Sequence, residues 1–474
     1  MRFVNKVIPA VDLAVPWFSF KKDPQSLQLL FDFVTASEAS QLDPVRAARD
    51  IALEHVADWN WDDHARVVST EDYDCDGDDS PDIARTVHLS LDVPSLLYQE
   101  SRYSFLDPRK IERRHAVAFG EAKAMVEIPC SLMKETLDEG SGKKLRAIVE
   151  FGHGLFGNRE EMKDGFLRRM GNNNGYITMG MDWRGMSRVD LPIVIRTLVG
   201  NPDLFQAVRD NLIQGFANKI CLQHFSQNGM LRLEAFKFGG TSIPTLNHRP
   251  PTSAFYGISQ GGILGGGYMS VIGKTKLIDR GILGSPGSPF TLVLTRSLDF
   301  GSYDKLFLKN FYNNRHVRIA LALMQMAWDS TEASGFQARP VLEPVPRLLI
   351  QAGLGDAVVP TIAAESLARA MGASLLPGSP RSVFGLPTES AADDDKWIGP
   401  KVTLSELLYE QEYSSLPIDN DYFSAGSHDT LSENRVHFCL RWDSAMIEQI
   451  EEFVNTGRVI DPCRNDHCQR ETCS

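Results

Sequence analysis

Three features that would mark whole classes of protein are missing from this sequence: a basic excess, a long apolar run and a high cysteine content. Of its 474 residues, 49 are Lys or Arg and 61 are Asp or Glu, which gives a net charge of −12. Nucleic acids and anionic membrane surfaces both attract basic faces, so the acidic balance argues against both kinds of partner.

Long apolar segments are also absent. A membrane-spanning helix needs about 20 apolar residues, and the longest apolar helix candidate, residues 319–328, is interrupted by Gln325. Asn5, Lys6 and Pro9 interrupt the apolar residues near the start, where a secretory signal needs about 7–15 in a row. We therefore expect no transmembrane segment and no signal peptide in this chain.

The seven cysteines are few for this length, but three of them fall in the last 12 residues. Their spacing is C-x4-C-x4-C, but zinc sites usually combine a C-x2–4-C pair with a second pair of ligands, and no second pair follows here. A local disulfide between Cys463 and Cys468 is therefore favoured over a metal site if the protein is exported.

The pattern of apolar residues changes near residue 145. Residues 1–144 indicate an N-terminal α+β region, with helical spacing in 26–52 and strand-like runs at 84–93 and 115–129. Short, continuous apolar runs then alternate with helical stretches. Such runs are typical of strands buried on both faces of a parallel sheet, and intervening helices complete βαβ units. The runs lie at 145–151, 175–182, 252–259, 277–284 and 347–353.

The second region is predicted to end with a helix around Met446–Val454, which Gly457 terminates, so we place this domain at 145–458. Two long insertions, at about 183–249 and 288–344, interrupt its alternating pattern. Their helical apolar spacing suggests a lid that shapes a hydrophobic pocket, although both could be packing elements. Residues 459–474 form a cysteine-containing tail.

The strongest chemical signal is the G-x-S-x-G sequence around Ser259. A serine on a sharp turn between a strand and a helix projects its hydroxyl from the edge of the sheet. The run 252–258 is a strand candidate, and a glycine-rich helix candidate follows. Glycines two residues on either side, Gly257 and Gly261, would leave room for the crowded backbone. We predict that Ser259 is a nucleophile rather than part of a structural turn.

A nucleophilic serine needs a base, and on this kind of turn the acid and then the histidine follow the serine in the chain. Four histidines follow Ser259: His316, His428, His437 and His467. His428 lies in a loop just before the final helix, where the base is expected, so we predict His428 as the base. His437 is its main rival.

The acid is expected after the next-to-last strand. Asp356 follows the run 347–353 in a glycine-containing turn and lies four residues before Pro360, too early to be the N-cap of the helix there. We predict that Asp356 orients the histidine. Backbone N–H groups of Leu155 and Gln260 are the predicted oxyanion-hole donors, whereas His153, beside Leu155, is predicted to be structural.

A weaker signal lies in the N-terminal region, where Asp72, Asp74 and Asp76 match the first half of a calcium loop. The bidentate glutamate of an EF-hand would fall at position 83, which is Ile83. The sequence therefore favours an acidic, solvated loop over a calcium site, and we expect no other cofactor.

Together these motifs resemble the α/β-hydrolase fold family over about residues 145–457. A narrower resemblance, to mostly exported bacterial hydrolases of this fold, rests on residues 151–157, 182–187, 259–262, 296–300 and 461–463, with 31–38 ahead of the core. In that group more chain precedes residues 31–38. The resemblance implies a mostly parallel sheet with helices on both faces, ester hydrolysis and export.

These observations predict a serine hydrolase that cleaves small or lipid-like carboxylic esters through an acyl-enzyme. A peptidase or acyltransferase with the same triad, and a non-catalytic binding protein on a hydrolase scaffold, are the alternatives. The oligomeric state and the physiological substrate are not predicted.

Overall fold

The computed structural model describes residues 37–77, 82–113, 117–301, 303, 306, 313–337, 344–388, 401–410, 435–463 and 468–472. The chain divides into two units, residues 1–40 and 41–474, and the central sheet and the candidate site belong to the second.

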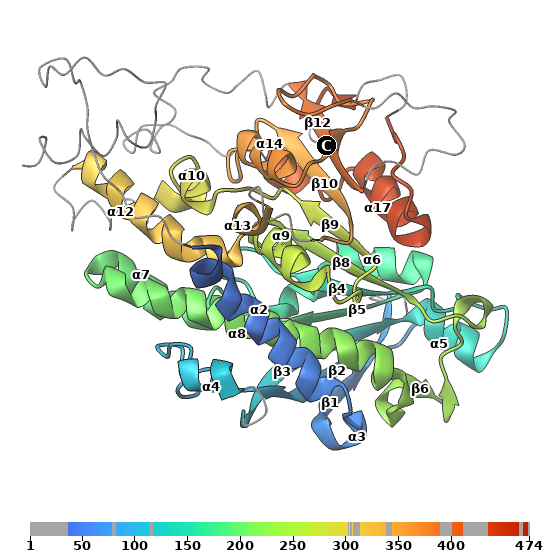
Figure 1. Cartoon of the computed structure of the whole chain (residues 1–474). Helices are drawn as coiled ribbons and strands as arrows, with labels where there is room; N and C mark the ends of the chain where they lie inside the picture. Colours follow the sequence, from blue (N-terminus) through green and yellow to red (C-terminus); the bar gives the residue numbers. More distant parts are fainter. Residues whose placement is uncertain are drawn as a thin grey trace, which may run out of the picture. The chain divides into compact units, whose positions relative to one another are not determined.

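One sheet organises this second unit (Figure 1). Within the described residues it has eleven strands, with β1-β2-β3-β5-β4-β8-β9-β10-β12-β11 side by side and β13 on β12. The strands from β5 to β11 run parallel, whereas β1, β2 and β3 extend the sheet in antiparallel fashion. Their bounds are β1 (Ala65–Asp72), β2 (Ile83–Pro94), β3 (Phe119–Pro129), β4 (Ala147–Gly152), β5 (Tyr176–Met181), β8 (Thr252–Ile258), β9 (Arg280–Gly284), β10 (Arg347–Leu354), β11 (Ser374–Leu375), β12 (Val402–Tyr409) and β13 (Gln469–Arg470).

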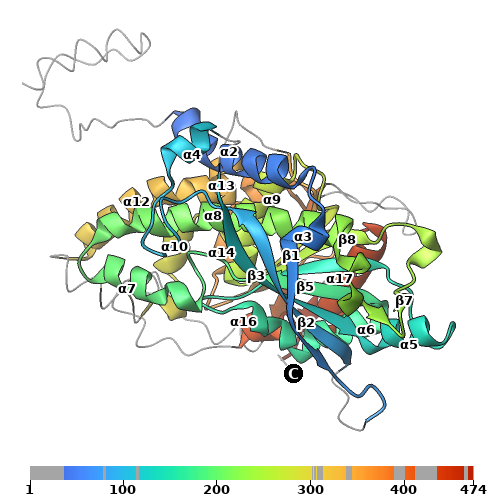
Figure 2. The same ribbon diagram turned by 90° about the horizontal axis from the view of Figure 1, so that it is seen from below.

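Helices cover both faces of the sheet, as predicted for this fold class. α8 (Phe205–Asn228) and α9 (Gln260–Ile272) pack on one face, and α6 (Gly165–Asn174) and α17 (Ser444–Thr456) on the other (Figure 2). The remaining α-helices are α2 (Glu38–Val56), α3 (Trp61–His64), α4 (Pro108–Arg113), α5 (Cys130–Leu137), α7 (Leu191–Val199), α10 (Phe290–Leu294), α12 (Asn314–Trp328), α13 (Ala333–Gln337), α14 (Thr361–Ala370) and α16 (Val436–Cys439).

The apolar runs found in the sequence correspond to central strands. β4, β5, β8, β9 and β10 each contain most of one predicted run, and nearly all of their residues are buried, as continuous apolar runs require. The strand-like runs of the N-terminal region form β2 and β3, which pair into the same sheet through β5. The predicted final helix is α17, and Gly457 ends it in the left-handed conformation.

A buried charge pair fixes α8 against the centre of the sheet. Lys219 Nζ of α8 lies 2.9 Å from Glu150 Oε1 of β4, and both side chains are fully buried. Gln223 Nε2, one turn along α8, donates to Glu150 Oε2 at 2.6 Å. Buried charges are tolerated when they are paired and hydrogen-bonded, so this cluster locks α8 in register with β4. The turn after β4 leads into the candidate site.

Both long insertions are largely helical. The first contains α7 and α8 together with a small hairpin, β6 (Lys237–Phe238) and β7 (Thr241–Ser242), and the second contains α10, α12 and α13. Among the described helices, none has the length and apolar character needed to cross a membrane.

Candidate active site

The predicted nucleophile occupies a strained turn. Ser259 lies between β8 and α9 with φ 57° and ψ −127°, a combination that few non-glycine residues adopt. Its N–H donates to the carbonyl oxygen of Gly284 at the end of β9, at 2.9 Å, which holds the turn against the neighbouring strand. The residue is 8% exposed and lies on the wall of a cavity. A strand, a sharp turn and a helix therefore follow one another around Ser259, as the sequence predicts.

Close backbone contacts explain the two flanking glycines. A Cβ on Gly261 would lie 2.0 Å from the carbonyl oxygen of Gly152, at the end of β4. A Cβ on Gly257 would lie 2.2 Å from the carbonyl oxygen of Gly261 itself. Neither position therefore accommodates a side chain, and the G-x-S-x-G spacing follows from the packing of α9 against the strand ends.

The predicted acid lies immediately after β10 and is buried. One carboxylate oxygen of Asp356, Oδ1, accepts hydrogen bonds from the N–H groups of Val358 at 2.8 Å and Val359 at 2.9 Å. The other oxygen, Oδ2, lies 2.7 Å from Nδ1 of His437, and both side chains are nearly inaccessible. The two N–H donors fix the carboxylate so that its free oxygen faces an imidazole.

His437, the rival in the sequence prediction, is therefore the partner of Asp356, while the predicted base, His428, lies outside the described residues. His437 belongs to the short helix α16, which packs on the end of β10. A Cβ on Gly353 of that strand would meet the Val436 side chain at 2.5 Å. Within the described residues, Nε2 of His437 has no hydrogen-bond partner.

The turn after β4 is rigidly hydrogen-bonded. Nδ1 of His153 lies 2.9 Å from the carbonyl oxygen of Gly154, while Nε2 accepts from the N–H of Trp183 at 2.8 Å. Burial lowers the pKa of His153 to about 4, so the ring is neutral at neutral pH, with its proton on Nδ1. The N–H of Gly154 donates to Glu161 Oε2 at 2.8 Å. These contacts give His153 a structural position, in agreement with the prediction.

Leu155 and Gln260, the predicted oxyanion-hole residues, line the same cavity as Ser259. Gln260 is the first residue of α9, so its N–H has no acceptor within the helix. Its side chain connects the turn after β4 with the loop after β5. Nε2 donates to the carbonyl oxygen of Met186 at 2.9 Å and to that of Gly154 at 3.4 Å. The sequence had indicated no role for this side chain.

The cavity beside Ser259 has a volume of about 790 Å³, including the space at its mouth, and a mostly apolar wall. Both insertions contribute to it: α7 and α8 from the first, and α10 and α12 from the second. Apolar lining residues include Val194, Leu198, Phe205, Val208, Phe290, Val293, Met324 and Trp328. No Lys, Arg or His is among the described residues of this wall. An extended apolar group of a ligand would therefore be accommodated next to the serine.

Asp299 is the one carboxylate on this wall among the described residues, and its surroundings shift its pKa. Desolvation raises the pKa of its carboxyl, the nearby His437 lowers it, and Asp356 raises it. The ring of Tyr303 lies on the same wall, and the negative charge of Asp299 contributes to raising the Tyr303 pKa, although burial is the larger cause. Asp299 is thus within electrostatic reach of both members of the buried pair.

The three aspartates that match the first half of a calcium loop have other partners in the structure. Asp72 lies 2.5 Å from Arg85 Nε, Asp76 lies 2.8 Å from Lys134 Nζ, and Asp74 accepts from the N–H of Asp76 at 2.9 Å. Among the described residues these carboxylates do not form a group close enough to share an ion. The sequence favours an acidic, solvated loop here over a calcium site, and these ion pairs do not favour calcium either.

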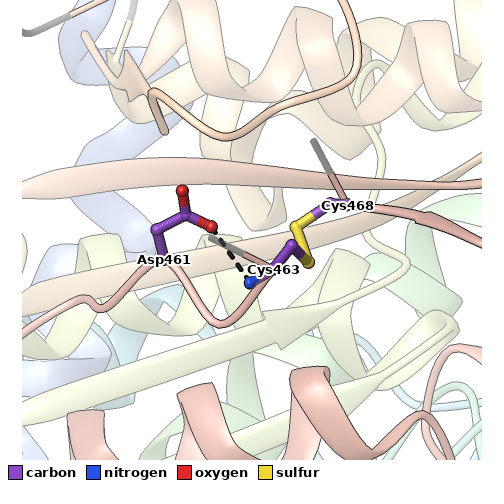
Figure 3. A group of neighbouring side chains, drawn as sticks. All are labelled: Asp461, Cys463 and Cys468. Carbon is purple, nitrogen blue, oxygen red and sulfur yellow. Dashed lines mark hydrogen bonds between the residues drawn. A yellow bond between two sulfur atoms is a disulfide. The ribbon is translucent and has the colours of Figure 1, made fainter. Parts of the chain in front are cut away.

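The cysteine tail contains the predicted disulfide. Cys463 and Cys468 are bonded, and the carboxylate of Asp461 accepts from the N–H of Cys463 at 3.1 Å (Figure 3). Both sulfurs are used in this bond, so neither can bind a metal as a thiolate. A second disulfide joins Cys75 to Cys130 across 55 residues.

Comparisons with known proteins give structural matches only, since no family model and no curated protein matches the sequence. An acetyl xylan esterase from Thermoanaerobacterium is 11% identical with a TM-score of 0.39, over 80% of this chain and 94% of that one. An S-formylglutathione hydrolase from Agrobacterium tumefaciens is 11% identical with a TM-score of 0.34, over 81% and 99%. An acylaminoacyl peptidase from Pyrococcus horikoshii is 13% identical with a TM-score of 0.31, over 62% and 36%.

These likenesses are too weak to assign an activity. The fold class rests on the chain itself: a mostly parallel sheet with helices on both faces and a serine elbow between β8 and α9. This is the architecture of the α/β-hydrolase fold.

Proposed function

We propose that this protein is a serine hydrolase that cleaves carboxylic esters through an acyl-enzyme intermediate. The observation that carries the proposal is a strained, cavity-lining serine after β8 together with a buried carboxylate–imidazole pair after β10, two strands along the same parallel sheet. Ser259 is the nucleophile, His437 the base and Asp356 the residue that orients the base. The proposal replaces His428 with His437 because Asp356 is hydrogen-bonded to His437.

The hydrogen bonds at His437 define its chemical role. Because Asp356 is an acceptor only, Nδ1 of His437 carries the proton and Nε2 presents a lone pair. Nε2 takes the hydroxyl proton of Ser259 as the oxygen attacks the ester carbonyl carbon. The resulting imidazolium then gives this proton to the departing alkoxide, and Asp356 balances its charge. Water activated in the same way releases the acid.

The negative oxygen of the tetrahedral intermediate requires two aimed donors. We assign these to the backbone N–H groups of Leu155 and Gln260, which lie on the cavity wall with Ser259. The hydrogen bonds of His153 and of the Gln260 side chain hold the turn at Gly154 in place before substrate binds. A donor that needs no reorganisation during the reaction contributes more to catalysis.

The apolar cavity favours a hydrophobic acyl group. Its wall comes from both insertions, so the predicted role of these segments in shaping the pocket is part of the proposal. We further propose that the protein works in an oxidising compartment, since the Cys75–Cys130 and Cys463–Cys468 disulfides would not persist among cytosolic reductants.

Activity-based labelling tests the nucleophile. A fluorophosphonate probe followed by peptide mass mapping should modify Ser259 in the intact protein, and Ser259→Ala should abolish labelling while leaving the unfolding temperature nearly unchanged. Equal labelling of the variant would refute the assignment. Comparison of p-nitrophenyl esters with the corresponding anilides then separates an esterase from a peptidase, because faster amide cleavage would contradict the ester proposal.

Two histidine variants test the base. His437→Gln should lower kcat by about 10⁴-fold or more, as expected for loss of a triad histidine, whereas His428→Gln should retain most activity. The reverse result would restore the original prediction of His428 and remove the role proposed for the Asp356–His437 pair.

A further inference from the structure

We infer that Asp299 selects the leaving group of the ester by charge, favouring an alcohol that carries a positive charge over a neutral alcohol of the same shape. The inference deepens the proposed function and rests on it. Asp299 takes no part in the proton transfers described above, so its role is distinct from that of Asp356.

The carboxylate of Asp299 is conspicuous for its lack of partners. Its backbone N–H donates to Ser297 Oγ at 3.2 Å, but within the described residues its side chain has no hydrogen bond and no ion pair. Asp299 is an exposed residue, although desolvation still acts on its carboxyl, and it lies on a wall that is otherwise mostly apolar. An unpaired carboxylate in such a place retains its capacity to bind a positively charged ligand group.

The position of Asp299 points to the leaving group rather than the acyl group. The N–H of Leu298, the residue before Asp299, donates to the carbonyl oxygen of Ala357 at 3.0 Å, which places Asp299 next to the turn that holds Asp356 and its partner His437. In the proposed mechanism His437 protonates the departing alkoxide, so groups near His437 that also line the cavity face the alcohol part of the ester. The long apolar part of the cavity, lined by α7, α8 and α12, then receives the acyl chain.

Two further observations favour a cation over a neutral hydroxyl. First, the described residues of the cavity wall include no Lys, Arg or His to offset the charge of Asp299. Second, aromatic rings cluster beside it: Tyr303 stacks on Phe300 with 6.2 Å between ring centroids and lies 6.0 Å from Phe156. Aromatic faces next to a carboxylate attract a quaternary ammonium group through both its charge and its apolar surface.

A matched pair of substrates tests the inference directly. Butyrylcholine and 3,3-dimethylbutyl butyrate share their acyl group and leaving-group shape, and differ in one positive charge. The wild-type enzyme should have a kcat/KM about tenfold higher for the choline ester, which corresponds to about 1.4 kcal/mol. Asp299→Asn keeps the shape, removes the charge and should bring the ratio close to one. Asp58→Asn, which removes an exposed carboxylate outside the cavity, should leave the ratio unchanged.

A second measurement does not depend on turnover. Choline should protect Ser259 from the fluorophosphonate probe at a concentration about tenfold lower than 3,3-dimethylbutanol does, and Asp299→Asn should abolish this difference. Equal protection by the two alcohols, no protection by either, or an unchanged ratio in Asp299→Asn would overturn the role of Asp299. Absence of Ser259 labelling without any alcohol would instead refute the proposed function, so the two failures are distinguishable.

Discussion

Replacing Asp356 by asparagine should nearly abolish activity while leaving the fold intact. Asparagine has the same shape, and its carbonyl oxygen can accept the hydrogen bonds that Val358 and Val359 donate to Oδ1. Its amide nitrogen then takes the place of Oδ2, 2.7 Å from Nδ1 of His437. Because that nitrogen is a donor, it stabilises the tautomer in which Nδ1 accepts and Nε2 carries the proton.

The magnitude follows from this tautomer. An imidazole with its proton on Nε2 cannot take the proton of Ser259, and loss of the correct tautomer in a triad lowers kcat by about 10⁴-fold. At about 1.36 kcal/mol per factor of ten, this is a loss of roughly 5 kcal/mol of transition-state stabilisation. KM should change little, since Asp356 does not contribute to the cavity wall.

Steady-state hydrolysis of p-nitrophenyl butyrate measures the effect, and urea unfolding checks the fold. Residues of one catalytic unit are strongly non-additive, so adding His437→Gln to Asp356→Asn should reduce kcat by far less than His437→Gln alone does. A variant that retains a tenth of wild-type kcat, or strict additivity in the double variant, would refute the coupling of Asp356 to His437.

Three further outcomes are expected. Replacing Cys75 and Cys130 by serine should lower the free energy of unfolding by about 4 kcal/mol, because the disulfide closes a loop across 55 residues and so restricts the unfolded chain. A loss below about 1 kcal/mol in urea unfolding would contradict this. The pKa of His153 falls from about 6.5 in the unfolded chain to about 4 in the folded protein, so stability present above pH 6.5 is lost as the pH falls towards 4. Between pH 6.5 and 4 the free energy of unfolding of His153→Gln should therefore fall by about 3 kcal/mol less than that of the wild-type protein. The same pH dependence in both proteins would argue against a buried neutral ring. Val194→Trp, which extends an indole from α7 into the cavity, should lower kcat/KM for octanoyl but not acetyl esters by about tenfold, whereas an equal effect on both would place the acyl chain elsewhere.

Short-range features of the site could be predicted from the sequence. The elbow at Ser259 and the turn at Asp356 each depend on a few consecutive residues, where glycines and an apolar run dictate a strand followed by a sharp turn. The disulfide between Cys463 and Cys468 is similarly local, and its prediction is confirmed. Each of these features leaves a recognisable pattern within about ten residues.

The partner of Asp356 could not be fixed in the same way. Chain order restricted the base to histidines after Ser259, but His428 and His437 both precede the last helix. The choice depends on how α16 packs against β10 through Val436, a contact between segments about 80 residues apart that no local pattern encodes. The same limitation applies to Asp299, which the second insertion brings to the cavity wall shared with Ser259, through the hydrogen bond from the N–H of Leu298 to the carbonyl oxygen of Ala357.

Strand β12 escaped prediction for a different reason. Thr403, Ser405 and Glu406 interrupt its apolar pattern, yet all three are buried in the sheet. Glu406 is paired there with Arg381, although burial still raises its pKa to about 7. Polar residues inside a strand weaken the periodic signal, and only a long-range partner makes their burial acceptable.

The separate anchoring of the proposed catalytic groups indicates why the arrangement depends on the whole sheet. The turn after β4, which carries one proposed oxyanion donor, is held by α9 and by the loop after β5, through Gln260 and His153. His437 is held from the end of β10, through Asp356. Within the part of the chain that the structure describes, β4, β8, β9 and β10 lie side by side between these anchors. A change that shifts β10 relative to β8 should therefore reduce catalysis while leaving the strained geometry of Ser259, and its hydrogen bond to Gly284, in place.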